Sequence, residues 1–290
     1  MMKILVTGSS GRTGPSVVNS LARHYEIRGM DLRRAPGLQC ADFYYGDITD
    51  MLDVQRAIEG VEAVVHLGAR SGNSRMDPEN VIRTNVTGTY HILEAAREAG
   101  VTRVVLISSE CALGYAQGRF RPKGQFPLHY LPIDENHPDS PTSEYGLSKL
   151  LGERLCRGYT EGCGMQTFCL RPSSILLPED YSHFARIYQD PEAWDNMWSV
   201  VDVRDVAAAI HLCLENRTLM HEVFYINSGL MAVETPASEI IRRFFPDITE
   251  LPEGLDDRKS LISIEKACRL LGYTPRYLWQ GESDGPGEPG

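Results

Sequence analysis

The stretch 3-KILVTGSSGRTGP-15 carries the strongest structural signal in this sequence. Its first part, Lys3–Thr7, is a continuous apolar run, which is typical of a strand buried on both faces of a parallel sheet. Gly8, Gly11 and Gly14 then recur every three residues, and Pro15 is tolerated only near the start of a helix. The stretch therefore predicts a strand, a tight glycine turn and the first turn of a helix.

Strand-like and helix-like segments alternate from this stretch through the first half of the chain. Further strands are expected at Glu26–Leu32, 43–45, Ala63–Leu67, Arg103–Ser108 and Thr167–Arg171, and helices at 12–23, 53–59, 78–99 and 142–159. Such alternation predicts βαβ units, in which each helix crosses between parallel strands. The expected fold class is α/β, with a doubly wound parallel sheet and a small C-terminal lobe.

The pattern loosens after residue 172, where weaker signals remain. Helices are expected at 203–215, 236–245 and 264–271, with a strand at 223–227. The last helix is capped by Ser263 and stopped by Gly272.

The expected domain organisation follows from these signals. We expect a main domain at 1–172, which 200–230 rejoins, a small lobe made of 173–199 and 231–279, and a disordered tail at 280–290. The segment 113–141 is rich in Gly, Pro and aromatic residues, and its length predicts a functional loop or a lid.

Composition disfavours several classes of protein. The 290 residues are 42% hydrophobic and 23% charged, as in soluble globular proteins, with a formal net charge of -10. A nucleic-acid binder normally presents a basic face, so that class is disfavoured. No apolar run reaches the roughly 18 residues that a membrane span requires. The seven cysteines are scattered without a CxxC pair or a Cys/His cluster, which predicts reduced thiols, no metal site and a cytoplasmic location.

The glycine turn suits a phosphate-bearing ligand. Glycine lets the backbone approach a pyrophosphate, and the following helix offers unpaired N–H groups and the positive end of its dipole. Asp31 ends the second strand, 23 residues after Gly8, close to the spacing of an acid that binds ribose hydroxyls. An acid there repels a 2′-phosphate, which favours NAD over NADP, although Arg33 and Arg34 could accept one. A glycine turn without a ligand is the alternative, and a P-loop is excluded because its GK[ST] ending is missing.

Two further stretches fit the same ligand. Asp47 follows a short strand in 46-GDITD-50, where its carboxylate could meet an adenine amino group. Gly68 and Ala69 end a strand in 66-HLGAR-70, and their small size would let a cofactor lie close. Either stretch taken alone is more often structural than functional.

Taken in order, these motifs resemble those of the extended short-chain dehydrogenase/reductase superfamily, in its NAD-dependent epimerase/dehydratase branch. The resemblance runs through TGSSGRTG, Asp31, GDITD, HLGA, TNVTGT, LISSECALG, Tyr145-x-x-x-Lys149, LRP and VVDVRDVAAAI. It implies a Rossmann-type domain that binds NAD, a small substrate lobe, and a homodimer formed through the two long helices. The residues that it assigns to the cofactor are Gly8, Ser10, Gly11, Arg12, Thr13, Gly14, Asp31, Arg33, Asp47, Ile48, Leu67, Gly68, Ala69, Asn85, Ser108, Tyr145, Lys149 and Pro172.

Tyr145 and Lys149 lie four residues apart on a predicted helix, so they face the same way. An unperturbed phenol titrates at about 10 and is a poor base at neutral pH. A nearby cation, together with a positively charged nicotinamide, favours the phenolate and is expected to lower the pKa of Tyr145. A surface tyrosine and a solvated lysine are the alternative, and it fits poorly beside the glycine turn.

The resemblance places a third catalytic group, Ser109, five residues before Gly114. Its hydroxyl would donate to the substrate oxygen that Tyr145 deprotonates, at the carboxyl end of a parallel strand. A pair of buried serines bonded to the backbone is the alternative, and it fits Ser108 better than Ser109.

The resemblance leaves the reaction and the substrate open. A dehydrogenase would release an oxidised product and NADH, whereas an epimerase would return the hydride to the other face of the sugar. A dehydratase often needs an acidic pair after the catalytic hydroxyl, and Glu110 and Cys111 supply only one carboxylate. The expected substrate is a sugar or nucleotide-sugar, bound by Ser71, Ser109, Glu110 and Ser174.

Two alternatives concern the substrate and the class of protein. The short lobe and the HLGARS and SSECALG stretches resemble uronate dehydrogenases, which oxidise free sugar acids, but no arginine stands out as a partner for a carboxylate. A non-catalytic NAD-sensing module is also open, because a fold alone does not establish chemistry. The complete set of Ser109, Tyr145 and Lys149 disfavours it, since a sensor needs no proton relay.

Overall fold

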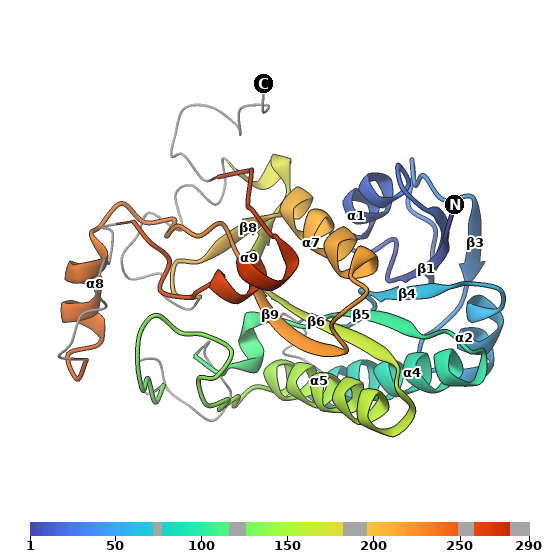
Figure 1. The fold of residues 1–290 in the computed structure, drawn as a ribbon, viewed down its shortest axis with the longest axis horizontal. Coiled ribbons are helices and arrows are strands. Elements are labelled where there is room, and N and C mark those ends of the chain that lie inside the picture. Colours follow the sequence, from blue (N-terminus) through green and yellow to red (C-terminus); the bar gives the residue numbers. More distant parts are fainter. Residues whose placement is uncertain (72–76, 116–125, 182–195, 249–257, 279–290) are drawn as a thin grey trace.

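The computed structural model describes residues 1–71, 77–115, 126–181, 196–248 and 258–278. At its centre lies a seven-stranded sheet in the order β3-β2-β1-β4-β5-β6-β9 (Figure 1). Its strands are β1 (Lys3–Thr7), β2 (Glu26–Asp31), β3 (Asp42–Tyr45), β4 (Ala63–His66), β5 (Arg103–Ile107), β6 (Gln166–Pro172) and β9 (His221–Ile226). Every neighbouring pair is parallel, so the predicted doubly wound parallel sheet is confirmed.

The strand order reverses beside β1. The chain adds β2 and β3 on one side of β1 and then crosses to its other side to form β4, β5 and β6. In open parallel sheets the ligand crevice lies outside the carboxyl ends of the strands at such a reversal. The glycine turn follows β1 directly, so it lies at this crevice.

Helices cover both faces of the sheet (Figure 1). One face carries α1 (Gly14–Leu21), α7 (Val203–Glu215) and α9 (Glu265–Leu271), and the other carries α2 (Met51–Ile58), α4 (Gly88–Glu98) and α5 (Glu144–Cys163). Side chains of β1 enter both cores, with Ile4 and Val6 in the first and Leu5 in the second. Burial on both sides explains why this strand is apolar throughout.

The helix predicted at 78–99 is divided in the structure. α3 (Pro78–Ile82) passes into a π-helical turn at Arg83–Thr87, and that turn passes into α4. Turns of this kind are rare overall, and many of those that occur lie at functional sites. Asn85 lies in the middle of the turn and is buried.

The helix predicted at 142–159 is shifted toward the C-terminus. Ser143 caps α5, because its Oγ accepts a hydrogen bond from the Gly146 N–H at 3.0 Å. Gly164 ends α5 in the left-handed region, with a φ of 73°. The cap places Tyr145 in the first turn of the helix.

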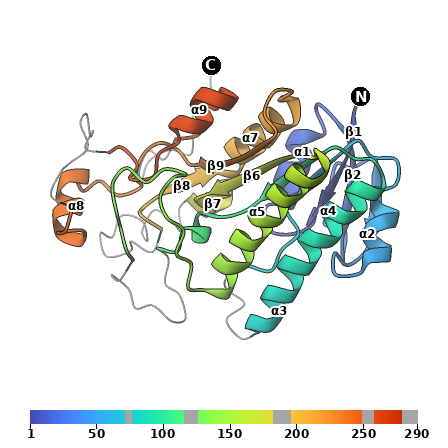
Figure 2. The ribbon, with the colours of Figure 1, turned by 60° about the horizontal axis from the view of Figure 1, so that its bottom comes forward.

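The C-terminal half contains two short strands that the sequence did not predict. β7 (Ser174–Leu176) and β8 (Val200–Asp202) form a separate parallel pair, and three residues are too few for a periodic pattern. α8 (Ala237–Phe244) lies far from the sheet (Figure 2). A hydrophobic cluster of its own, which includes Tyr115 and Trp198, fills this part of the molecule.

Three of the predictions fall partly or wholly outside the described residues. These are the loop or lid at 113–141, of which 116–125 is not described, the small lobe, of which 182–195, 249–257 and 279 are not described, and the tail at 280–290. In the described ranges, no helix is both long enough and apolar enough to cross a membrane.

Candidate active site

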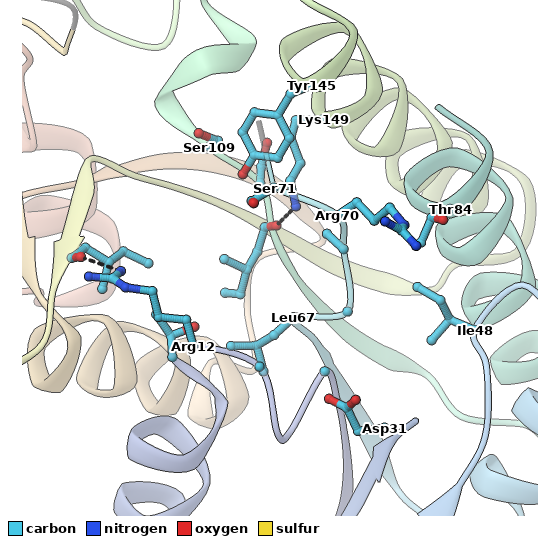
Figure 3. Close-up of a pocket in the computed structure, with 18 of the residues that line it drawn as sticks. Arg12, Asp31, Ile48, Leu67, Arg70, Ser71, Thr84, Ser109, Tyr145 and Lys149 are labelled. Carbon is cyan, nitrogen blue, oxygen red and sulfur yellow. Dashed lines mark hydrogen bonds between the residues drawn. The ribbon is translucent and has the colours of Figure 1, made fainter. Parts of the chain in front are cut away.

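A cavity of about 610 Å³ opens at the carboxyl ends of the central strands (Figure 3). Gly8, Gly11 and Asp31 line one part, which we call the glycine end. Ser109, Tyr145 and Lys149 line another part, which we call the tyrosine end. The cavity therefore joins the two groups of residues that the sequence singled out separately.

Most of the predicted site residues line this cavity, and four do not. The predicted residues in its lining are Gly8, Gly11, Arg12, Thr13, Asp31, Asp47, Ile48, Leu67, Gly68, Ala69, Ser71, Ser108, Ser109, Glu110, Tyr145, Lys149, Pro172 and Ser174. Ser10, Gly14, Arg33 and Asn85 lie outside it.

The three glycines of the turn differ in what they contact. Gly8 has a φ of 68°, and a Cβ there would lie 2.6 Å from the Gly68 nitrogen. At Gly14 a Cβ would lie 2.5 Å from the Gly8 oxygen. At Gly11 it would meet only that same oxygen, at 3.3 Å. Gly14 is thus required by the packing of the turn on itself, while Gly11 leaves the backbone accessible from the cavity.

Asp31 is held in place by main-chain donors. Its Oδ2 accepts a hydrogen bond from the Ser10 N–H at 2.9 Å, and its Oδ1 accepts one from the Leu32 N–H at 2.8 Å. The Ser10 hydroxyl accepts from the Ala35 N–H at 2.9 Å, so Ser10 supports the turn and does not reach the cavity. A fixed acid at the end of β2 suits a ribose diol and opposes a 2′-phosphate.

Arg12 connects the glycine turn to the lobe. Its Nη1 donates to the Ile175 carbonyl at 3.0 Å. Its Nη2 forms an ion pair with Asp180. Figure 3 shows Arg12 at the edge of the cavity. The side chain lines the cavity, but its guanidinium is directed to these two partners. Arg12 was predicted to contact the cofactor. The structure shows that its side chain also joins segments more than 160 residues apart in the sequence.

Asn85 acts behind the cavity wall. Its Oδ1 accepts from the Arg70 N–H at 2.7 Å, and its Nδ2 donates to the Arg70 carbonyl at 3.1 Å and to the Ser148 Oγ at 2.9 Å. The amide thus holds the segment after β4 against α5. Asn85 was predicted as a cofactor contact, which stays a prediction; it lies outside the cavity lining, and its amide joins Arg70 to Ser148.

Lys149 and Tyr145 share one face of α5, as their spacing predicted. The Lys149 ammonium lies 5.6 Å from the centre of the Tyr145 ring and donates to the Ile107 carbonyl at 2.7 Å (Figure 3). Burial lowers the pKa of Lys149 to about 8, and negative charge on Cys111 and Glu153 opposes the shift.

The pKa of Tyr145 moves in the direction opposite to our prediction. Burial of the phenol raises its pKa, and a hydrogen bond with Ser109 opposes the rise only in part. The expected lowering invoked the Lys149 ammonium together with a positively charged nicotinamide, and the ammonium alone, which is bound to the end of β5, does not offset the burial. The Ser109 Oγ also accepts from the Cys111 N–H at 3.1 Å, which fixes the serine at the start of a short 3₁₀ turn.

Ser108 belongs to a buried network behind the tyrosine end. Its hydroxyl donates to the Glu153 Oε1 at 2.6 Å, and Arg171 donates to both oxygens of Glu153, at 2.9 and 2.8 Å. Arg171 also pairs with Asp139 at 2.9 Å. Ser108 was predicted as a cofactor contact, with a buried serine bonded to the backbone as the alternative; it lines the cavity, and its hydroxyl binds the Glu153 side chain. Glu153 was missed, although its position one helical turn after Lys149 was a usable signal.

The cavity lining also includes residues that the sequence did not single out. Ser71, Glu110 and Ser174 line the cavity as expected, and the additional lining residues with polar side chains are Thr49, Arg70, Asn80, Arg83, Thr84, Cys111 and Ser173. Asn80, Arg83 and Thr84 lie on α3 and the π turn, and no short motif marked this helix as part of the site.

Comparison with known proteins identifies the family of this chain. The profile of the NAD dependent epimerase/dehydratase family matches residues 4–226. The chain belongs to this family. An NAD-dependent glucose-6-phosphate dehydrogenase from Haloferax volcanii is 28% identical, over 96% of this chain and 97% of that protein. A uronate dehydrogenase from Pseudomonas syringae is 33% identical, over 59% of each chain.

A solved structure supports the family at the level of the fold. It is a short-chain dehydrogenase/reductase superfamily protein from Agrobacterium tumefaciens with bound NAD, 27% identical over 96% of this chain and 93% of that chain, with a TM-score of 0.70. The predicted resemblance, the Rossmann-type fold and the enzyme class are confirmed. NAD, the predicted cofactor, is the cofactor of the epimerase/dehydratase family.

Proposed function

We propose that this protein transfers hydride between the carbon of a sugar or nucleotide-sugar hydroxyl and NAD, with Ser109, Tyr145 and Lys149 as its proton relay. The observation that carries the proposal is the single cavity that joins these three residues to the glycine turn and Asp31. The relatives in the epimerase/dehydratase family that are named as dehydrogenases support the same class of reaction.

The residues of the glycine end fit a dinucleotide. Gly11 leaves main-chain N–H groups accessible to a pyrophosphate, and Asp31 is fixed where ribose hydroxyls would lie. Asp47 and Ile48 would hold the adenine, and Lys149 the ribose next to the nicotinamide. When bound, NAD supplies the hydride acceptor and a positive charge beside Tyr145.

The proton chemistry is assigned to the tyrosine end. Tyr145 takes the proton of the substrate hydroxyl, while Ser109 donates a hydrogen bond to the same oxygen. Ser109 and Tyr145 line the same end of the cavity, which supports this assignment because one small oxygen can then contact both groups. Lys149, whose ammonium lies 5.6 Å from the centre of the Tyr145 ring and donates to the Ile107 carbonyl, would place a positive charge in the same end of the cavity and orient the cofactor ribose.

The test is a screen of free and nucleotide-linked sugars with NAD, followed by absorbance of NADH and by product analysis. NADH formation indicates a dehydrogenase, and a new sugar isomer without net NADH indicates an epimerase. Tyr145→Phe is expected to lower kcat by about 100-fold to 10,000-fold. Tyr45→Phe, at an exposed position on β3, is the matched control. NAD binding with neither NADH nor an isomer in any reaction would favour the sensing module.

A homodimer through α4 and α5 is part of the proposal. The two helices lie side by side (Figure 2) and contact one another. Their outer faces expose Tyr90, Leu147 and Leu151 at 43%, 38% and 45% of their surfaces, more than helices of a monomer usually leave to solvent at neighbouring positions. The molar mass in solution, measured by light scattering, tests this assembly against the 32.4 kDa of one chain.

A further inference from the structure

Glu110 is a buried acid at the tyrosine end of the cavity. It follows Ser109 directly, lines the cavity and exposes 4% of its surface. Its Oε2 atom is buried and makes no hydrogen bond. The other buried acids among the described residues, Glu153, Asp202 and Asp205, all accept hydrogen bonds. Glu110 alone among these four acids presents a buried carboxyl oxygen without a partner.

Among the described residues, no cation contributes to the pKa of Glu110. Burial raises that pKa to about 8, and the hydroxyls of Ser173 and Tyr115 beside the carboxyl oppose the rise only in part. The Tyr115 Oη also lacks a hydrogen bond. The raised pKa favours the uncharged carboxylic acid of Glu110 at neutral pH.

The basic side chains that line the cavity are directed to other partners. Arg12 binds the lobe, Lys149 binds the end of β5, and Arg83 donates to the neighbouring α3. Arg70 points toward Thr84 and away from the tyrosine end (Figure 3). An anion bound beside Glu110 would find each of these basic groups already bonded to protein or directed away.

We propose that Glu110 restricts the tyrosine end to an uncharged sugar and disfavours a sugar acid. The inference rests on the proposed function and names the substrate class of the same site. A carboxylic acid can donate a hydrogen bond to one sugar hydroxyl and accept one from another, which leaves neither group unpaired. A substrate carboxylate in the same place would lie beside a second carboxyl group without a compensating cation, which is costly in a buried site.

The selection is expected to strengthen as the pH rises. A sugar acid is ionised throughout the neutral and alkaline range, while Glu110 gains its negative charge above about pH 8. Two like charges then face each other in a site of low dielectric constant. The preference for the neutral sugar should therefore increase between pH 6.5 and pH 9.5, by about tenfold or more.

The experiment uses the full chain and two matched pairs, glucose with glucuronate and UDP-glucose with UDP-glucuronate. For each pair we would measure kcat/KM with NAD, and binding to the complex with NADH by calorimetry, across this pH range. The variants are Glu110→Gln, which keeps the shape and removes the charge, and Glu161→Gln, which removes a charge from an exposed position on α5.

We expect wild-type protein and Glu161→Gln to act on one of the two substrate pairs. Within that pair, kcat/KM should be higher for the neutral sugar than for the sugar acid, and the ratio should increase with pH. Glu110→Gln is expected to lose the pH dependence and to accept the acid about tenfold better at pH 9.5. The pH series is compared with Glu110→Gln, because Lys149 also loses its charge in this range. If the variant fails to fold, use of the acid by wild-type protein at pH 6.5 still tests the inference. Equal or better use of the acid by wild-type protein, a preference that does not change with pH, or binding of neither sugar would overturn the inference. The same pattern in binding without turnover would support it while contradicting the proposed reaction.

Discussion

The two ends of the cavity differ in whether main-chain or side-chain groups form the site. At the glycine end the decisive groups belong to the main chain, because Gly8 and Gly14 pack against backbone atoms and backbone N–H groups hold Asp31. At the tyrosine end the decisive groups are side chains, which β5 and α5 bring together and a buried network supports. A site made of backbone tolerates few residue types at each position, whereas a site made of side chains depends on partners that lie far apart in the sequence.

The sharpest test of this contrast compares two adjacent serines at the tyrosine end. Ser109→Ala is expected to lower kcat by about 100-fold, since it removes a donor to the substrate oxygen, with a stability loss of about 1 kcal/mol from the lost cap. Ser108→Ala is expected to leave kcat within about tenfold but to lower the free energy of unfolding by about 1–3 kcal/mol, because Glu153 loses a buried donor. Kinetics and urea unfolding measure both. Equal kinetic effects of the two substitutions would contradict the assignment.

A second test acts on the glycine end through cofactor choice. Asp31→Ser is expected to raise the ratio of kcat/KM for NADP to that for NAD by about 100-fold, because the 2′-phosphate no longer faces a fixed carboxylate. Arg33 and Arg34 follow in the sequence and would favour the phosphate once the acid is gone. Asp247→Ser, which removes the same charge from an exposed position in the lobe, should leave the ratio unchanged. An unchanged ratio in Asp31→Ser would show that this acid does not set the preference.

The third test compares two glycine-to-alanine substitutions that are expected to change the free energy of unfolding in opposite directions. Gly14→Ala places a Cβ 2.5 Å from backbone atoms, so it is expected to lower the free energy of unfolding by about 1–3 kcal/mol. Gly158→Ala, on the exposed side of α5, meets nothing within 4 Å and is expected to raise it by about 0.5–1 kcal/mol. Urea denaturation compares the two. Similar values for both would mean that the turn relaxes around the added methyl group.

The same contrast explains which features the sequence could predict. Strand β1, its glycine turn and Asp31 lie within one short stretch, and each has a local signature: an apolar run, a glycine spacing and an acid at a strand end. The parallel sheet followed from the same kind of signal, repeated along the chain. Tyr145 and Lys149 were also predictable, because helical periodicity places residues four apart on one face.

The features that were missed depend on partners distant in the sequence. The bond from Arg12 to Asp180 crosses 168 positions, and the pair of Glu153 with Arg171 joins a helix to a strand. The expected lowering of the pKa of Tyr145 also invoked a bound nicotinamide and stays a prediction. The bond from the Lys149 ammonium to the carbonyl at the end of β5 was missed, because helical spacing alone does not reveal it. The π turn and the strands β7 and β8 are too short to leave a period in the sequence.

The smallest expected effect concerns the energetic cost of the lysine at the tyrosine end. The folded protein lowers the pKa of Lys149 to about 8, below its ordinary value, so the unfolded chain binds more protons between those two values. Stability contributed by this group therefore rises with pH across that window. In Lys149→Met this contribution is absent, so the difference in unfolding free energy, variant minus wild type, is expected to fall by about 1 kcal/mol between pH 7 and pH 9. Urea unfolding at both pH values measures it, with Lys259→Met as the reference for the same change at an exposed site. A difference that stays constant or grows with pH would mean that the buried ammonium is not destabilised by its surroundings, and the lysine would then resemble the well-satisfied groups of the glycine end.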